Sequence, residues 1–88
     1  MLSSLVFTLI GPDRPGLVER VASCVAEHGG NWEESEFLSL DGQFAGLVRV
    51  RVDERARARL KGALERLDGV SVRVAEAASA TEAQGRVF

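Results

Sequence analysis

The sequence predicts an α+β fold in which two helices cover one face of a four-stranded antiparallel sheet. Segments with the two-residue period of strands alternate with two segments whose apolar residues recur at helical spacing. Asp41-Gly42, in the middle of the chain, is a strong signal for a two-residue hairpin turn. The chain has 88 residues, of which 45% are hydrophobic, so it is long enough for one small domain with a real core.

The chain opens with a strand and a helix. Residues 5–10, LVFTLI, are apolar at both alternating sets of positions, which predicts a central strand covered on both faces. Gly11-Pro12 ends this strand. Pro15 suits the first position of a helix, and the apolar residues that follow it lie on one helical stripe. Gly29-Gly30 is typical of a left-handed helix cap, so the helix is predicted from Pro15 to His28.

Two strands flank the Asp41-Gly42 turn. The segment from Asn31 to Leu40 has an acidic middle, which an edge strand or a β-bulge tolerates. The segment from Phe44 to Val52 alternates cleanly, with valines on one face and arginines on the other.

The C-terminal half repeats the helix–strand order. Asp53 is predicted to cap a second helix that ends at Asp68-Gly69, and residues 70–74 form the last strand. Gly62 inside this helix costs roughly 1 kcal/mol relative to alanine, which a close backbone contact would explain. Right-handed crossovers in a βαββαβ order place both helices on one face, as in the ferredoxin-like arrangement. The other face stays open, and a second copy is its simplest cover.

Composition restricts the partners and cofactors. The formal net charge of −2 argues against nucleic acid or an anionic membrane as the main partner, and the first apolar run is too short to span a bilayer. The single cysteine, Cys24, cannot form an internal disulfide, and no Cys/His cluster is spaced for a metal. We therefore expect no metal or cofactor, no direct nucleic-acid contact, no membrane contact and a reducing, cytoplasmic setting.

Residues that could catalyse a reaction have simpler structural interpretations. His28 is the only histidine and falls at a helix end without an evident partner, and Cys24 lies on an apolar stripe. Glu34 and Glu36 share a strand face, where a solvated edge explains them. RNA-recognition domains have the same strand order, but Phe44 lacks the second aromatic residue that stacks a base. The sequence thus predicts no enzyme and no RNA-binding surface.

The loop GPDRPG between the first strand and helix can be a plain corner or a ligand site. The N–H groups of Gly16, Leu17 and Val18 could donate hydrogen bonds to a carboxylate, which the helix dipole would also attract. Asp13 can either cap the helix or accept a hydrogen bond from an ammonium group. Physical reasoning on these residues alone favours the structural corner.

Longer motifs resemble a known family. GPDRPGLVERVASCVAEHGGNWEES is similar to the start of an ACT domain, the small regulatory module of amino-acid metabolism, and the resemblance runs from Leu5 to about Ala77. Similar openings occur in formyltetrahydrofolate deformylases, uridylyltransferases and stringent-response synthetase/hydrolases. The segment NWEESEFLSLDGQFAGLVRVRV is most similar to the glycine cleavage system transcriptional repressor group.

The resemblance implies a non-catalytic regulatory domain that forms a homodimer by joining two sheets into one of eight strands. It implies that glycine or a similar small amino acid binds at the interface and modulates a protein partner, here a transcriptional regulator. The implied site residues are Gly11, Asp13, Arg14, Gly16, Leu17 and Val18 in one wall, with Asn31 near them and a second subunit completing the site.

Alternatives to this function are the regulatory domain of a deformylase-like enzyme and a ligand-free dimerisation module. Trp32 stands where the family usually has a smaller residue, so it is expected to fill the entrance to its strand or to pack there. The predicted ACT domain covers residues 1–78. Residues 79–88 are predicted to be a flexible tail or the start of a linker to a second ACT domain.

Overall fold

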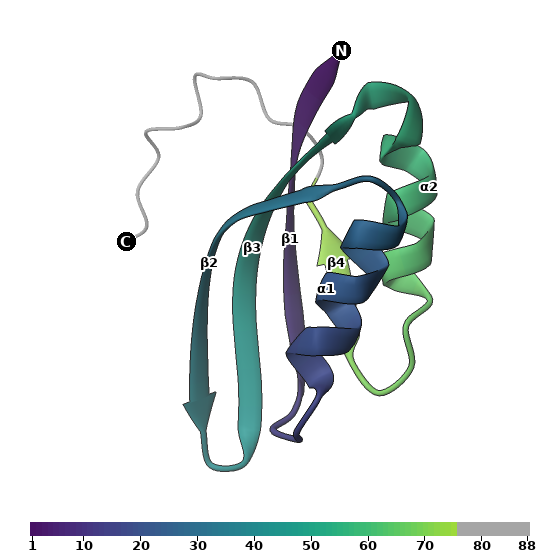
Figure 1. Cartoon of the computed structure of the whole chain (residues 1–88). Helices are drawn as coiled ribbons and strands as arrows, with labels where there is room; N and C mark the ends of the chain where they lie inside the picture. Colours follow the sequence, from purple (N-terminus) through teal and green to yellow (C-terminus); the bar gives the residue numbers. More distant parts are fainter. Residues whose placement is uncertain (76–88) are drawn as a thin grey trace.

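The computed structural model describes residues 1–75, so the predicted tail lies outside the described residues. Six elements follow in the predicted order (Figure 1). They are β1 (Leu2–Pro12), α1 (Leu17–Glu27), β2 (Asn31–Leu40), β3 (Gln43–Asp53), α2 (Glu54–Glu65) and β4 (Ser71–Val74). This is the predicted ferredoxin-like βαββαβ fold.

The four strands form one antiparallel sheet in the order β2-β3-β1-β4, with both helices on one face (Figure 1). The two central strands, β1 and β3, pair along their whole lengths, whereas β4 contributes only four residues. Asp41 and Gly42 both have positive φ angles, 52° and 81°, as the tightest hairpin turns require, so the predicted hairpin is confirmed.

The core lies between the helices and the sheet. Alternate residues of the central strands are fully buried there, among them Leu5, Phe7 and Leu9 of β1. The opposite face of β1 is open, because Ile10 remains 54% exposed. The prediction of a strand covered on both faces therefore holds for only one face within a single chain.

Helix α1 begins two residues later than predicted. Arg14 to Leu17 form a turn in which the Leu17 N–H donates to the Arg14 carbonyl at 3.4 Å. Gly16 has φ +84°, and a proline followed by a glycine with positive φ is the pattern of a type II turn. Pro15 thus sets the turn and is not the first residue of the helix.

The C-terminal end of α1 confirms the predicted left-handed cap. Gly29 has φ +76°, and its N–H donates to the Ala26 carbonyl at 3.0 Å. The Gly30 N–H reaches back to the Val25 carbonyl at 2.9 Å, which completes a Schellman motif.

Strand β2 is an edge strand with a bulge, as its acidic middle predicted. The register with β3 shifts between Trp32 and Glu34, so Glu33 is the extra residue. The bulge turns Glu33 towards two arginines of β3: its carboxylate lies 3.1 Å from Arg51 Nε and 3.7 Å from Arg49 Nε.

Helix α2 is capped as predicted, because Asp53 Oδ1 accepts from the Arg55 N–H at 2.9 Å. Within residues 1–75, a close contact with backbone outside the helix does not explain Gly62. A Cβ placed there would meet only the end of the Arg66 side chain, at 3.4 Å.

Candidate functional site

The corner between β1 and α1 surrounds a hollow of about 160 Å³. Its lining residues are Asp13, Arg14, Gly16, Leu17, Val18, Glu19 and Phe44. Five of the seven predicted site residues are therefore brought together here. The remaining two, Gly11 and Asn31, lie elsewhere.

Free backbone donors face this corner. Gly16 is the N-cap of α1, and no side chain accepts from the first turn. The Leu17 N–H, predicted to be one of the free donors, instead donates to the Arg14 carbonyl at 3.4 Å, and the Arg20 N–H donates to the Gly16 carbonyl at 3.0 Å. The N–H groups of Val18 and Glu19 have no acceptor among residues 1–75. The positive end of the helix dipole adds to the attraction that these groups exert on an anion.

Asp13 does not cap the helix. Its Oδ2 accepts from Ser39 Oγ, near the end of β2, at 3.0 Å. The Asp13 N–H donates to the Gly42 carbonyl at 3.0 Å, which ties the loop to the β2–β3 turn. The carboxylate is thus held at the rim of the hollow with its other oxygen available to a hydrogen-bond donor.

Two lining residues were not predicted. Glu19 Oε1 lies 4.0 Å from the position that a Cβ on Gly16 would occupy, so a second carboxylate faces the corner. Phe44 lies opposite Gly11 in the β1–β3 register. An acidic residue in the first turn of a helix that lacks a side-chain cap is the sequence signal that would have indicated Glu19.

Gly11 packs away from the hollow. A Cβ at this position would lie 3.0 Å from the Gly69 carbonyl oxygen, so the glycine permits close contact with the turn before β4.

Asn31 lies at the far end of the sheet from the loop. It is opposite Arg51 on β3, whereas Pro12 is opposite Gln43. These two β3 positions are eight residues apart (51 − 43), or about 26 Å along the strand. The prediction that Asn31 lies near the loop is therefore wrong within a single chain.

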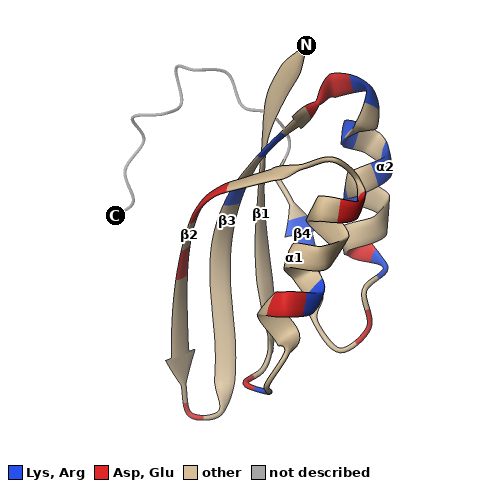
Figure 2. Ribbon diagram, viewed as in Figure 1, with Lys and Arg blue, Asp and Glu red and all other residues tan. Residues whose placement is uncertain are grey.

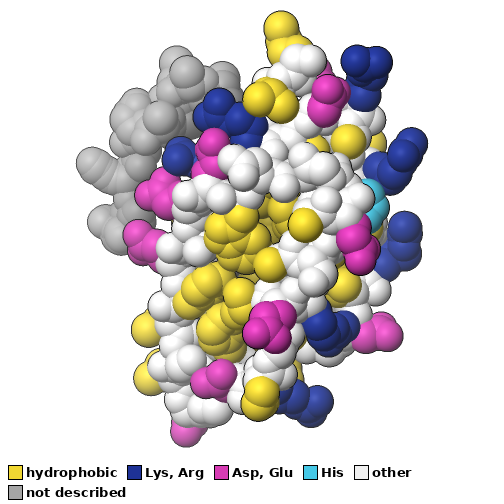
Figure 3. Space-filling model, in the orientation of Figure 1, with side chains coloured by type: hydrophobic (Ala, Val, Ile, Leu, Met, Phe, Trp, Pro, Cys, Tyr) yellow, Lys and Arg dark blue, Asp and Glu magenta, His cyan; other side chains and the backbone are white. Residues whose placement is uncertain are grey.

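An aromatic cluster extends from the hollow to the free edge of β2. Phe37 stacks on Phe44 with ring centroids 5.1 Å apart, and Trp32 lies 6.4 Å from Phe37. Trp32 packs against the core and donates from Nε1 to Ser35 Oγ at 3.1 Å, so its expected packing role is confirmed. Figure 3 shows hydrophobic side chains gathered between the β2–β3 hairpin and α1.

Cys24 and His28 do not form a nucleophile–base pair. The imidazole Nδ1 lies 2.9 Å from the Cys24 carbonyl oxygen, not from the thiol. Burial, and then the negative charge of Glu27, raises the pKa of the Cys24 thiol, which keeps it protonated and unreactive at neutral pH.

Residues 1–75 contain no group of three or more His, Cys, Asp or Glu side chains that could hold a metal ion. In the same part of the chain, neither helix has the length and hydrophobicity that a bilayer crossing needs.

Known proteins place this architecture in context. UPF0237 protein MK1213 of Methanopyrus kandleri is 38% identical over 53 residues, which cover 60% of this chain and 59% of that protein. An unknown protein from Galdieria sulphuraria is similar in structure, with a TM-score of 0.73 and 30% identity. A protein provisionally assigned as a glycine cleavage system transcriptional repressor has a TM-score of 0.75 and 22% identity.

The match to the Galdieria sulphuraria protein covers 90% of this chain, and the match to the repressor-like protein covers 89% of it. Each match covers only 48% of the other protein, so this chain spans about half the length of these two relatives. The family model of the ACT domain matches residues 3–74, which include all the strands and helices described above except Leu2 of β1. The chain therefore belongs to the ACT domain family.

Proposed function

We propose that this ACT domain binds a small amino acid, glycine or one of similar size, in the β1–α1 hollow of a homodimer. Occupancy of the hollow would then modulate a protein partner, a transcriptional regulator in the group that the sequence resembles. The observation that carries the proposal is the convergence of five predicted residues on one small hollow with free backbone donors.

The groups in the hollow match the two charges of an amino acid. The ligand carboxylate would accept from the N–H groups of Val18 and Glu19, at the positive end of α1, with Arg14 nearby. The ligand ammonium would donate to the free oxygen of Asp13, whose other oxygen is occupied by Ser39. A volume of about 160 Å³ favours a small side chain.

A dimer formed through β2 would complete this site. Strand β2 is an edge strand, and its Phe37 side chain remains 38% exposed. A twofold axis perpendicular to the sheet, at the middle of β2, would pair the two copies antiparallel and give one sheet of eight strands. Because antiparallel pairing sets the start of one strand beside the end of the other, Asn31 of a second copy would approach this loop.

Calorimetric titration of the full chain tests the proposal. Glycine, serine and alanine are the ligands, and acetate and methylamine, which each carry only one of the two charges, are the controls. We expect an amino acid to bind more tightly than either control. Asp13→Asn should abolish binding, whereas Asp41→Asn, the same change in the neighbouring turn and outside the hollow, should not.

A mixing experiment tests whether the site spans two copies. Asp13→Asn and Asn31→Ala homodimers should both fail to bind, because each site in them lacks one group. Mixed dimers contain one intact site, so about a quarter of all sites in an equal mixture should recover. If no amino acid binds the wild-type chain, the sensing function is refuted and the ligand-free dimerisation module is the better interpretation.

A further inference from the structure

The face of the sheet opposite the helices carries large apolar side chains. Its apolar residues come from the three longer strands and include Val6, Ile10, Leu38, Leu40 and Leu47. Leu47 is 51% exposed and Leu38 is 65% exposed. Exposed leucines that cluster on one face of a small domain indicate a surface that another molecule covers.

Two charges at the same level of the sheet lie at opposite edges of this face. Glu36 on β2 is opposite Leu47, Leu47 is opposite Thr8, and Thr8 is opposite Arg73 on β4. These residues form one row across the sheet, so Glu36 and Arg73 are three strand spacings, about 14 Å, apart. Acidic segments of β2 and a basic segment of β4 lie on opposite sides of the sheet in Figure 2.

Neither charge of this row is compensated within the described residues, because no ion pair there involves Glu36 or Arg73. The other two charged side chains of β2, Glu33 and Glu34, are already paired. Arg49 Nη2 lies 2.8 Å from Glu34 Oε1, and Arg51 pairs with Glu33 of the bulge. In this part of the chain, the open face therefore has an uncompensated negative charge at its β2 edge, from Glu36, and an uncompensated positive charge at its β4 edge, from Arg73.

The geometry points to a second copy of this chain as the cover: we propose that two copies stack their open faces about a twofold axis parallel to the strands. This axis places β2 of one copy over β4 of the other at an unchanged level. Glu36 then faces Arg73 of the second copy, and the reciprocal pair forms by symmetry. A twofold axis across the strands would instead set β4 over β4 and bring like charges together.

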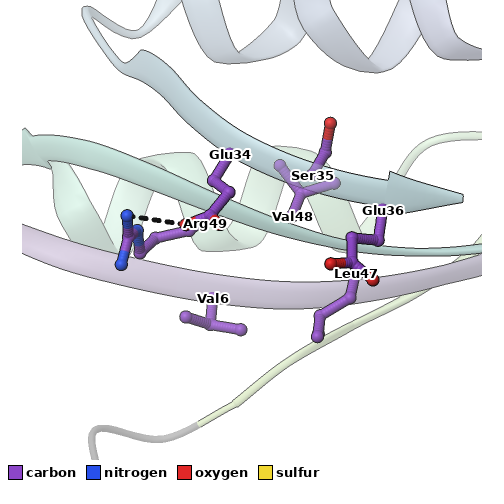
Figure 4. A pocket seen from close by; sticks show the side chains of 7 residues that line it. All are labelled: Val6, Glu34, Ser35, Glu36, Leu47, Val48 and Arg49. Carbon is purple, nitrogen blue, oxygen red and sulfur yellow. Dashed lines mark ion pairs between the residues drawn. The ribbon is translucent and has the colours of Figure 1, made fainter.

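The shape of the face suits this contact. Val6 and Leu47 point away from the helices and, with Glu36 and Arg49, border a hollow of about 290 Å³ (Figure 4). An apolar side chain of the facing copy can enter this hollow. Packed sheets lie about 10 Å apart and cross at about −30°, an offset that glutamate and arginine side chains can span.

The size of the face predicts a weak contact. Four strands about 4.8 Å apart and six residues of about 3.3 Å give a footprint of about 400 Å² on each copy. Stable interfaces bury about 800 Å² per partner, so this contact forms only at high concentration. The axis of this stacked contact runs through the middle of the sheet, whereas the axis of the proposed β2 dimer lies at the edge strand. A copy that uses both the open face and the β2 edge therefore recruits further copies, and association continues beyond the dimer.

Charge exchange on the full chain tests the proposal. Sedimentation equilibrium at concentrations up to about 1 mM should detect association of the wild-type chain. Glu36→Arg alone and Arg73→Glu alone should each weaken the stacked contact about tenfold or more, because like charges then face each other. The double variant E36R/R73E should recover the wild-type association, since both pairs are restored with reversed sign.

Mixing the two single variants is the sharper measurement. In the mixed pair one copy contributes two arginines and the other two glutamates, so both contacts become favourable. We expect the mixture to associate more tightly than either variant alone. Glu54→Arg, an exposed charge reversal on α2, is the matched control, and circular dichroism checks that every variant is folded. Failure of both the double variant and the mixture to recover association overturns the proposal, as does a wild-type chain whose association is unaffected by either single change.

Discussion

Gly46→Ala is predicted to destabilise the domain through a single contact, that of Gly46 with the Phe37 ring. Phe37 on β2 lies opposite Gly46 on β3, and its ring covers the glycine. A Cβ on Gly46 would lie 2.3 Å from Cδ1 and 2.4 Å from Cε1 of that ring. Ordinary contacts of this kind are about 3.5 Å or longer, so the ring has to move by more than about 1 Å.

The size of the destabilisation follows from the contacts that the Phe37 ring loses when it moves. The ring is partly exposed on an edge strand, so it can swing outward without displacing β3. It would then lose its stack on Phe44 and its contact with Trp32, and each aromatic pair contributes about 0.5–1.5 kcal/mol. Replacing glycine by alanine also lowers the conformational entropy of the unfolded chain, which stabilises the domain by about 0.4–1 kcal/mol. We expect a net loss of about 1–2 kcal/mol in the free energy of unfolding.

A double-mutant cycle, measured by urea denaturation, isolates this contact. In a Phe37→Ala background the clash is gone, so Gly46→Ala should stabilise the domain by the backbone gain alone, about 0.4–1 kcal/mol. The sign of the effect therefore reverses between the two backgrounds. Equal destabilisation in both would show that the glycine is required by the backbone and that the ring contact is not the cause.

Three further predictions concern stability. Asp53→Ala should lower the free energy of unfolding by about 1 kcal/mol in urea denaturation, because the hydrogen bond that caps the Arg55 N–H is lost. Asp53→Asn should retain most of the wild-type stability, because asparagine also caps helices. Gly62→Ala should raise stability by about 0.5–1 kcal/mol, since only the Arg66 side chain is nearby, and a loss would reveal strain. The pKa of the Cys24 thiol is raised in the folded state. The contribution of this thiol to the free energy of unfolding is therefore fully present below the ordinary thiol pKa of about 8.5 and declines as pH rises above it. Unfolding free energies measured across this range should show a decline in the wild type that Cys24→Ala lacks.

The sequence signals that succeeded are local. Alternation, helical spacing and the Asp41-Gly42 turn each depend on neighbouring residues, so strand order and hairpin position could be predicted from them. The turn also sets the pairing of Phe37 with Gly46, because counting outward from the turn brings these two residues opposite each other. This pairing therefore follows from the sequence once the turn is located.

The features that failed depend on tertiary structure. Pro15 suits both the first turn of a helix and the second position of a β-turn, and only the φ angle of Gly16 distinguishes the two. Asp13 finds its partner in Ser39, 26 residues away along the chain, so its local pattern could not exclude a helix cap. Asn31 was expected near the loop, whereas helix α1 carries the chain to the other end of the sheet before β2 begins.

The contact between Asp13 and Ser39 connects the hollow to the edge where the dimer is proposed. If the ligand binds between the two copies, it must favour the dimer over the monomer, and dimerisation must raise ligand affinity by the same factor. Glycine present at 100 times its dissociation constant would then stabilise the ligand-bound form by about 2.7 kcal/mol, roughly a hundredfold in equilibrium constant. Sedimentation with and without glycine should show the dimer dissociation constant falling, and Ser39→Ala should reduce this shift by loosening Asp13. A ligand that binds without changing the dimer dissociation constant would have a site confined to one copy, and Asn31 would then have no part in it.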